Sequence, residues 1–136
     1  RNNVDGLMPT AIDEMIRWVS PVRHFMRTAT ADTEVAGQKI KAGESMILWY
    51  PSANRDETVY TDPNAFRIDR KEGKQIAFGF GAHVCLGQHL ARMEMSSLFR
   101  KLLERVEHIE LAGEPQYTQA VFVGGLKSLP IRYKMK

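Results

Sequence analysis

The stretch Phe78-Gly79-Phe80-Gly81-Ala82-His83-Val84-Cys85-Leu86-Gly87 decides the fold, and it contains the only cysteine of the chain. Glycines precede this cysteine, and a helical pattern follows it. The exposed N–H groups at a helix N-terminus favour a thiolate. A thiolate that accepts backbone N–H bonds, beside glycines that let a flat ligand approach closely, suits the needs of a haem iron. Cys85 is therefore a candidate proximal iron ligand, although a cysteine considered alone is more often a buried structural residue.

The composition fits one soluble globular domain, since 43% of the 136 residues are hydrophobic and 26% are charged. The net charge is +3, but lysine and arginine are scattered without interleaved aromatic residues, so a nucleic-acid partner is not expected. The single cysteine excludes an internal disulfide and agrees with a reducing cytoplasm, which is the expected location. No apolar stretch approaches the roughly 18 residues that a membrane helix needs, so no membrane span is expected.

Hydrophobic periodicity predicts two helices. The first covers residues 10–19, with Thr10 as its N-cap and Pro21 just beyond its end. The second covers residues 86–106, directly after the cysteine, and has the strongest helical pattern in the chain. The residues expected on its apolar face are Leu90, Met93, Leu98, Leu102 and Val106.

Short strands are expected between the helices and in the tail. The pieces between the helices are 25–30, 34–40 and 45–50, and those in the tail are 108–111, 117–123 and 131–134. The first three predict a small antiparallel sheet, with a turn at Gly37. The apolar run at 46–49 suggests a strand buried on both faces. Residues 51–74 predict a long irregular segment with one helical turn near 53–57.

The cysteine stretch resembles the haem-binding loop of the cytochrome P-450 family. The matching positions are Phe78, Gly79, Gly81, His83, Cys85 and Gly87. His83 stands where many family members have arginine. The resemblance implies a mixed α and β fold, mainly α in the whole family domain. Its C-terminal portion has a Glu-x-x-Arg helix, a small antiparallel sheet, an irregular meander, the cysteine loop and a long proximal helix. Residues 1–136 are expected to form a single haem-binding portion of this kind, with the N-terminal two-thirds of the monooxygenase domain absent.

Glu14 and Arg17 are three residues apart and therefore share one helix face. An isolated pair of this kind is usually a surface salt bridge of little energetic value. The resemblance implies instead a structural triad, in which the pair binds a third polar residue from the irregular segment. Family members often carry an arginine where this chain has Ala65, and others carry it four residues after a phenylalanine, as in Phe66 to Arg70. Arg70 is the expected third member; the alternative is that it is simply solvated.

The resemblance also implies the cofactor, haem b (iron protoporphyrin IX). Cys85 is then both the catalytic residue and the iron ligand. Arg27 is expected to bind a haem propionate, because a guanidinium fork suits a carboxylate, and His83 is the second candidate. The remaining cofactor-binding residues are those that shape the loop, Phe78, Gly79, Gly81 and Gly87.

Substrate and partners follow from the same resemblance. The positions that line the substrate pocket in the family are occupied here by Val22, Phe25, Phe122 and Val123, for which plain core packing is an equal alternative. These apolar side chains predict a lipophilic substrate. The sequence of residues 20–29 and 52–57 resembles that of soluble bacterial members of the family that hydroxylate sterol side chains or terpenoids. The expected electron donor is a small acidic, ferredoxin-type protein that docks near Arg92, Arg100 and Lys101.

The function implied for the parent protein is that of a haem-thiolate monooxygenase, which inserts one oxygen atom of O2 into its substrate. One alternative is a haem-binding or sensing module without catalysis. Another is a fragment that is inactive without its N-terminal part. The isolated chain is expected to be inactive and poorly stable, because helices that would pack on its sheet are absent.

Overall fold

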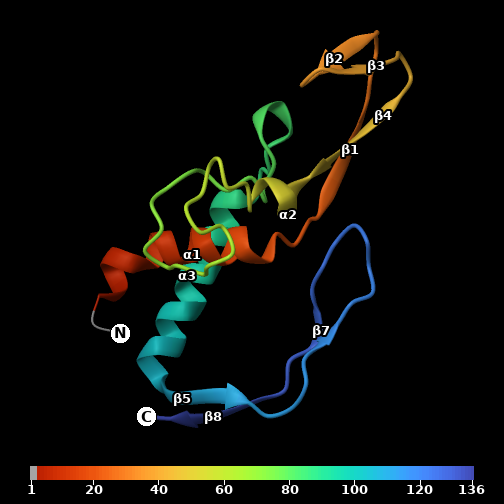
Figure 1. The fold of residues 1–136 in the computed structure, drawn as a ribbon. Helices are drawn as coiled ribbons and strands as arrows, with labels where there is room; N and C mark the ends of the chain where they lie inside the picture. Colours follow the sequence, from red (N-terminus) through yellow and green to blue (C-terminus); the bar gives the residue numbers. More distant parts are fainter. Residues whose placement is uncertain (1–2) are drawn as a thin grey trace.

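The computed structural model describes residues 3–136, with two long helices packed at its centre and strands at two edges (Figure 1). The helices are α1 (Val4–Val19), α2 (Tyr50–Ala53), the 3-10 turn η1 (Gly81–His83) and α3 (Gln88–Arg105). The strands are β1 (His24–Thr28), β2 (Thr33–Val35), β3 (Gln38–Ile40), β4 (Ser45–Trp49), β5 (Val106–Leu111), β6 (Gln116–Tyr117), β7 (Leu126–Ser128) and β8 (Ile131–Met135). The predicted mixed α and β fold is confirmed.

Helix α1 begins six residues earlier than the sequence predicts. Asn3 is its N-cap, and its side-chain oxygen accepts a hydrogen bond from the Gly6 amide at 3.2 Å. Pro9 lies inside the helix, and Thr10, the expected cap, donates its hydroxyl to the carbonyl of Ile68 at 2.6 Å. The predicted start was wrong because Pro9 and Thr10 are residues typical of a helix N-terminus, whereas Asn3 is the residue that caps the helix.

The end of α1 agrees with the sequence. Ser20 adopts a left-handed conformation with a φ of 41°, and its amide donates to the carbonyl of Ile16 at 2.9 Å. Pro21 follows and cannot continue the helix.

The core lies where α1 meets α3 and the segment before the cysteine loop. Its buried members are Met8, Ile12, Ile16 and Ala77, with Val4, Phe78, Met95, Phe99 and Leu103 packed against them. Helix α3 therefore turns its 95, 99 and 103 positions toward α1. The predicted apolar face of α3 was wrong at Leu90, Met93 and Leu98, which are all more than half exposed. It was right at its C-terminal end, where Leu102 is half-buried and Val106 is buried. The predicted set (90, 93 and 98) and the observed set (95, 99 and 103) both have helical spacing, so only the packing of α3 against α1 shows which set is buried.

Within residues 3–136, the strands form four separate two-stranded antiparallel pairs, β1 with β4, β2 with β3, β5 with β8 and β6 with β7. Residues 34–40 divide into two strands because Ala36 and Gly37 have φ values of 49° and 82° and form the turn. The predicted burial of residues 46–49 was wrong, because Ile47, Leu48 and Trp49 are 60%, 42% and 45% exposed. The β1·β4 ribbon extends away from the helices, so the described residues do not cover both of its faces (Figure 1).

Residues 54–76, here called the meander, contain no helix or strand, as predicted for 51–74. The expected helical turn near 53–57 lies instead at α2, where Pro51 occupies one of the first two positions. In the tail, the predicted strand at 117–123 shortens to β6 and a single bridge between Val22 and Val123.

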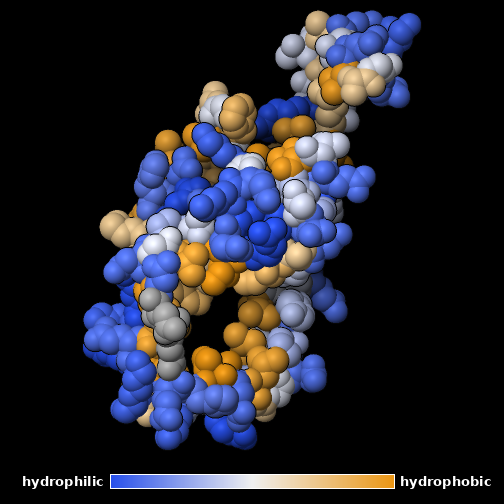
Figure 2. Space-filling model, turned by 60° about the vertical axis from the view of Figure 1, so that its left-hand side comes forward, coloured by the Kyte–Doolittle hydropathy of each residue, from blue (hydrophilic) through white to orange (hydrophobic). Residues whose placement is uncertain are grey.

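Large apolar side chains remain on the surface, and several surround the hollow between the helices and the C-terminal strands (Figure 2). Phe80 is 87% exposed and Leu86 is 98% exposed, both on the loop that carries Cys85. Exposed apolar surface of this kind marks a place where something binds. Among residues 3–136, no helix is both long and apolar enough to cross a bilayer.

Candidate functional site

A buried cluster of three charges joins α1 to the meander. Arg17 donates from Nε and Nη2 to the two carboxylate oxygens of Glu14, at 2.7 and 2.8 Å. Arg70 donates from Nε to Glu14 at 3.2 Å. The three side chains are between 1% and 3% exposed. The alternative of a solvated Arg70 is therefore excluded, and the two-point contact is the strong geometry for arginine and carboxylate.

The two guanidinium groups also bind main-chain carbonyls of the meander. Arg17 donates to Asn54 at 2.7 Å, Pro63 at 2.9 Å and Ala65 at 3.2 Å. Arg70 donates to Thr61 at 2.7 Å, Asp62 at 3.0 Å and Ala65 at 2.9 Å. A long segment without secondary structure leaves its carbonyls unpaired, and here the arginines satisfy them. The cluster therefore fixes the path of the meander.

The electrostatics of the cluster favour its charged forms. Burial alone raises the pKa of Glu14, but hydrogen bonds from Arg17 and the Arg67 amide, with the charges of Arg17 and Arg70, lower it below its usual value. The hydrogen bond to Glu14 in turn raises the pKa of Arg17. Tyr60 lies against both guanidinium groups, its ring centre 5.1 Å from Arg17 and 5.8 Å from Arg70. Burial raises the pKa of this phenol.

The cysteine loop continues from the meander to α3. The Cys85 amide donates to the carbonyl of Phe78 at 2.8 Å, which closes the loop into a ring. Gly79 and Gly81 have φ values of 76° and 68°, which only glycine adopts readily. A Cβ atom at Gly79 would also lie 3.3 Å from the His83 carbonyl oxygen, so a side chain there would force the turn to shift. Cys85 itself is exposed, just before the start of α3.

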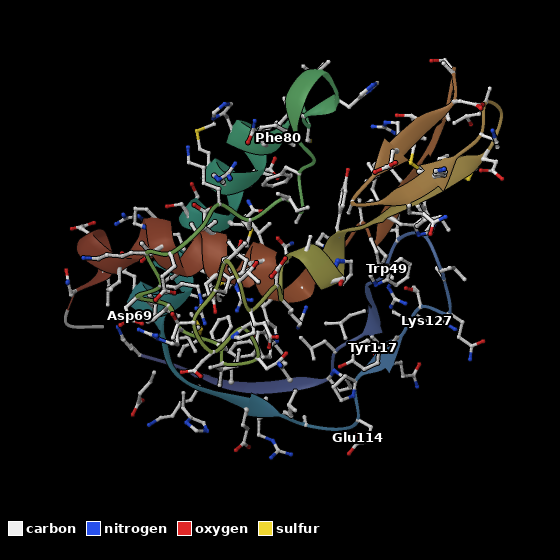
Figure 3. The ribbon with its side chains drawn as sticks, turned by 45° about the horizontal axis from the view of Figure 1, so that its top comes forward. Trp49, Asp69, Phe80, Glu114, Tyr117 and Lys127 are labelled. Carbon is white, nitrogen blue, oxygen red and sulfur yellow. The ribbon has the colours of Figure 1, made fainter. Side chains whose placement is uncertain are left out.

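A cleft of about 500 Å³ opens beside this loop and is lined by both expected propionate ligands. Arg27 reaches it from β1, and His83 reaches it from η1. Its other lining residues are Ile47, Leu48, Trp49, Tyr50, Ala53, Ile76, Gly79 and Phe80. Figure 3 shows Phe80 on the loop and Trp49 at the base of the β1·β4 ribbon, on either side of this space.

These features fit a haem group. The thiol of Cys85 is exposed, and a side chain built at Gly81 would meet nothing within 4 Å, so a flat ring system has free approach to this side of the loop. The cleft places an arginine and an imidazole near the same loop, as two propionates would require.

Comparison with known proteins shows the family of the chain. The family model described as Cytochrome P-450 matches residues 6–135. The chain belongs to the cytochrome P-450 family. It is 52% identical over 128 residues to cytochrome P-450-terp of a Pseudomonas species, covering 94% of this chain and 30% of that protein. It is 46% identical over 127 residues to a steroid C26-monooxygenase of Mycolicibacterium smegmatis, covering 92% of this chain and 32% of that protein.

A solved cytochrome P-450 structure has the same fold. The crystal structure of CYP108D1 from Novosphingobium aromaticivorans superposes with a TM-score of 0.92 at 48% identity, covering 99% of this chain and 33% of that one. The chain thus spans about a third of the length of the proteins it matches. The fold predicted from the cysteine loop is confirmed by this likeness.

The four residues expected along the cytochrome P-450 substrate pocket lie together. Val22 and Val123 form a bridge between the end of α1 and the tail. The rings of Phe25 and Phe122 meet edge to face, with centres 5.5 Å apart. Phe25, Phe122 and Val123 are 42%, 47% and 45% exposed. They therefore form an apolar wall that remains open on one side, rather than part of the buried core.

The residues expected to contact an electron donor all have partners within the chain. Arg92 pairs with Asp13 at 3.0 Å and lies over the Phe78 ring, 4.9 Å from its centre. Arg100 pairs with Asp5. Lys101 pairs with Glu104 at 2.8 Å. Arg92 thus connects α1, α3 and the cysteine loop.

Asn54 is the residue that the sequence analysis missed. It is 0% exposed, and its side chain binds Ser20 at the end of α1 and the amide of Ile76, two residues before the cysteine loop. From the sequence alone, Asn54 is recognised only as a residue that interrupts helical periodicity. No spacing rule marks an asparagine in an irregular segment as buried.

We predict that Glu14→Gln destabilises the protein and flattens the acid side of its stability profile. Because folding lowers the pKa of Glu14, the ionised carboxylate contributes its full stability above about pH 4.3 and loses it as the pH falls through the folded-state pKa. The variant leaves the buried guanidinium of Arg17 without its carboxylate, while Arg70 keeps its ion pair with Glu72 at 2.8 Å, and the cost is about 3 kcal/mol at neutral pH. Urea unfolding at neutral pH and at steps below pH 5 measures both effects.

The matched control is Glu34→Gln on the exposed strand β2, which is expected to leave the free energy of unfolding almost unchanged. An acid profile of Glu14→Gln with the same slope as the unmodified protein would contradict this role of Glu14.

Proposed function

We propose that this chain is the haem-binding part of a haem-thiolate monooxygenase, with Cys85 as the proximal iron ligand. The observation that carries the proposal is an exposed thiol on a glycine loop that opens beside a cleft lined by Arg27 and His83. Membership of the cytochrome P-450 family and the likeness to a steroid C26-monooxygenase support oxidoreductase chemistry. The reaction proposed is insertion of one oxygen atom of O2 into a lipophilic substrate.

Each group of residues has a distinct part in this proposal. When bound, the haem supplies the iron at which O2 is activated, and a thiolate ligand favours O–O cleavage. Cys85 holds the iron through its sulfur. Arg27 and His83 hold the propionates by charge and hydrogen bonding. Gly79 and Gly81 keep the loop free of side chains on its approach to the ring.

The proposed cofactor is haem b. Covalent attachment of the c type uses two cysteines in a Cys-x-x-Cys-His motif, and this chain has one cysteine. In the proposal that thiol is already the axial ligand, so this chain has no further cysteine for a thioether bond to the haem.

The proposed substrate is a sterol or a terpenoid. The wall of Val22, Phe25, Phe122 and Val123 offers apolar and aromatic surface and no charge, which suits a hydrocarbon skeleton. A steroid C26-monooxygenase among the relatives supports the sterol part. The wall would also exclude water from the substrate.

The proposed electron donor is a small acidic, ferredoxin-type protein, and the proposed location is the cytoplasm. The net charge of +3 supports an acidic partner. The single cysteine in a proposed catalytic role supports a reducing compartment. Because the chain spans about a third of its relatives, we assign turnover to the full-length enzyme and expect none from residues 1–136 alone.

The axial ligand is tested by the absorption spectrum of the full-length protein with haem, reduced under carbon monoxide. The expected result is a strongly red-shifted Soret band, because the thiolate donates electron density to the iron. Cys85→Ser replaces the thiol with a hydroxyl of similar size and should lose that shift completely. A red-shifted band that survives in Cys85→Ser would refute the assignment.

The substrate class is tested by binding spectra of the full-length protein with a cholestenone and with linalool. At least one of them should shift the Soret band on titration. Phe122→Ala should weaken that binding about tenfold, through loss of aromatic contact area. Tyr117→Ala is the matched control, since Tyr117 is 70% exposed on strand β6 and is not one of the four wall residues. If neither compound shifts the Soret band, this substrate class is excluded.

A further inference from the structure

We propose that Asn54 is a positioning residue that fixes the cysteine loop relative to the buried charge cluster. This inference rests on the proposed function, because it concerns the loop that carries Cys85. Asn54 ends α2 and begins the meander, and it is not charged, catalytic or exposed. Its four polar groups, two in the side chain and two in the backbone, each make a hydrogen bond, and three of these bonds join separate parts of the chain.

The side-chain amide of Asn54 connects two segments that are far apart in the sequence. Its Nδ2 donates to the Ser20 hydroxyl at 2.8 Å, at the end of α1. Its Oδ1 accepts the amide of Ile76 at 2.9 Å, at the entry to the cysteine loop. One planar group thus sets the distance and the angle between these two segments.

The backbone of Asn54 ties the same residue to the cluster. Its carbonyl accepts Nη1 of Arg17 at 2.7 Å, and its amide donates to the Tyr50 carbonyl at 2.9 Å. Ser20 donates its own hydroxyl hydrogen to the Arg17 carbonyl at 2.8 Å, so its oxygen remains the acceptor for Asn54. Asn54 is 0% exposed, and Ser20 and Arg17 are each 1% exposed. Water has no access to replace any of these bonds, and an unpaired group here carries its full desolvation cost.

From Ile76 the connection reaches Cys85 in two further backbone bonds. The Ile76 carbonyl accepts the Gly79 amide at 2.8 Å and forms the turn that opens the loop. The Phe78 carbonyl then accepts the Cys85 amide at 2.8 Å. Ile76 also lines the cleft shared by Arg27 and His83. The position of Ile76 therefore determines where the thiol lies relative to the cleft.

The test is Asn54→Ala in the full-length haem protein, read by amide hydrogen exchange and by the reduced carbon monoxide spectrum. Loss of the acceptor should speed exchange across residues 75–85 about tenfold, while α3 exchanges as before. The fraction of haem with the red-shifted thiolate band should fall. Asn64→Ala is the matched control, because Asn64 lies exposed in the same meander and should change neither reading.

Each outcome decides the inference. Unchanged exchange at 75–85, or equal acceleration throughout the protein, overturns it. If Asn54→Ala does not fold, Ser20→Ala frees the Nδ2 side of the same amide, and exchange at 75–85 must then rise or the inference fails. A wild-type protein without the red-shifted band would overturn the proposed function instead, and the exchange data would still decide whether Asn54 holds Ile76.

Discussion

The contact on which the structure depends is the buried carboxylate of Glu14 between the guanidinium groups of Arg17 and Arg70. A buried ion pair stabilises a fold little compared with a well-packed apolar core, because removing charges from water is costly. The contribution of this buried cluster is to fix the positions of the segments that it joins. The donors that Glu14 does not use bind carbonyls of the meander, and so one helix face organises a long segment that has no secondary structure of its own.

The order created by the cluster reaches the cysteine loop by two routes. One is polar and passes through Asn54 to the amide of Ile76. The other is apolar, since Ala77 is buried against α1 and Phe78 packs on the same core while Arg92 covers its ring. A thiol that is to hold a metal ion must stand in one place although it is exposed. These two routes hold the glycine loop in place, as the proposed ligation of iron by Cys85 would require.

The sequence predicts those parts of the molecule that short-range chemistry determines. The glycine spacing before Cys85 and the Glu14 to Arg17 interval are both local patterns, and each lies where it was expected. The role of Arg70 was predicted from the family resemblance alone, because nothing in the neighbouring sequence indicates that its side chain binds Glu14 on α1. Asn54 and the packed face of α3 were missed, since both depend on which segment lies opposite. The burial of β4 was wrongly predicted for the same reason. An apolar run indicates side chains that favour burial, but it does not show which segment packs against them.

The planar fork of Arg17, and not its charge alone, holds Glu14 and the meander together. The most direct measurement is haem retention and the reduced carbon monoxide spectrum of the full-length Arg17→Lys protein. Lysine keeps the positive charge but has no planar fork, so it cannot bind Glu14 at two points and three carbonyls as well. Arg132→Lys on exposed β8 is the control, since Arg132 pairs only with Glu110 among the described residues. We expect loss of bound haem and of the red-shifted band in Arg17→Lys alone. Full haem content with an unchanged band in Arg17→Lys would contradict it.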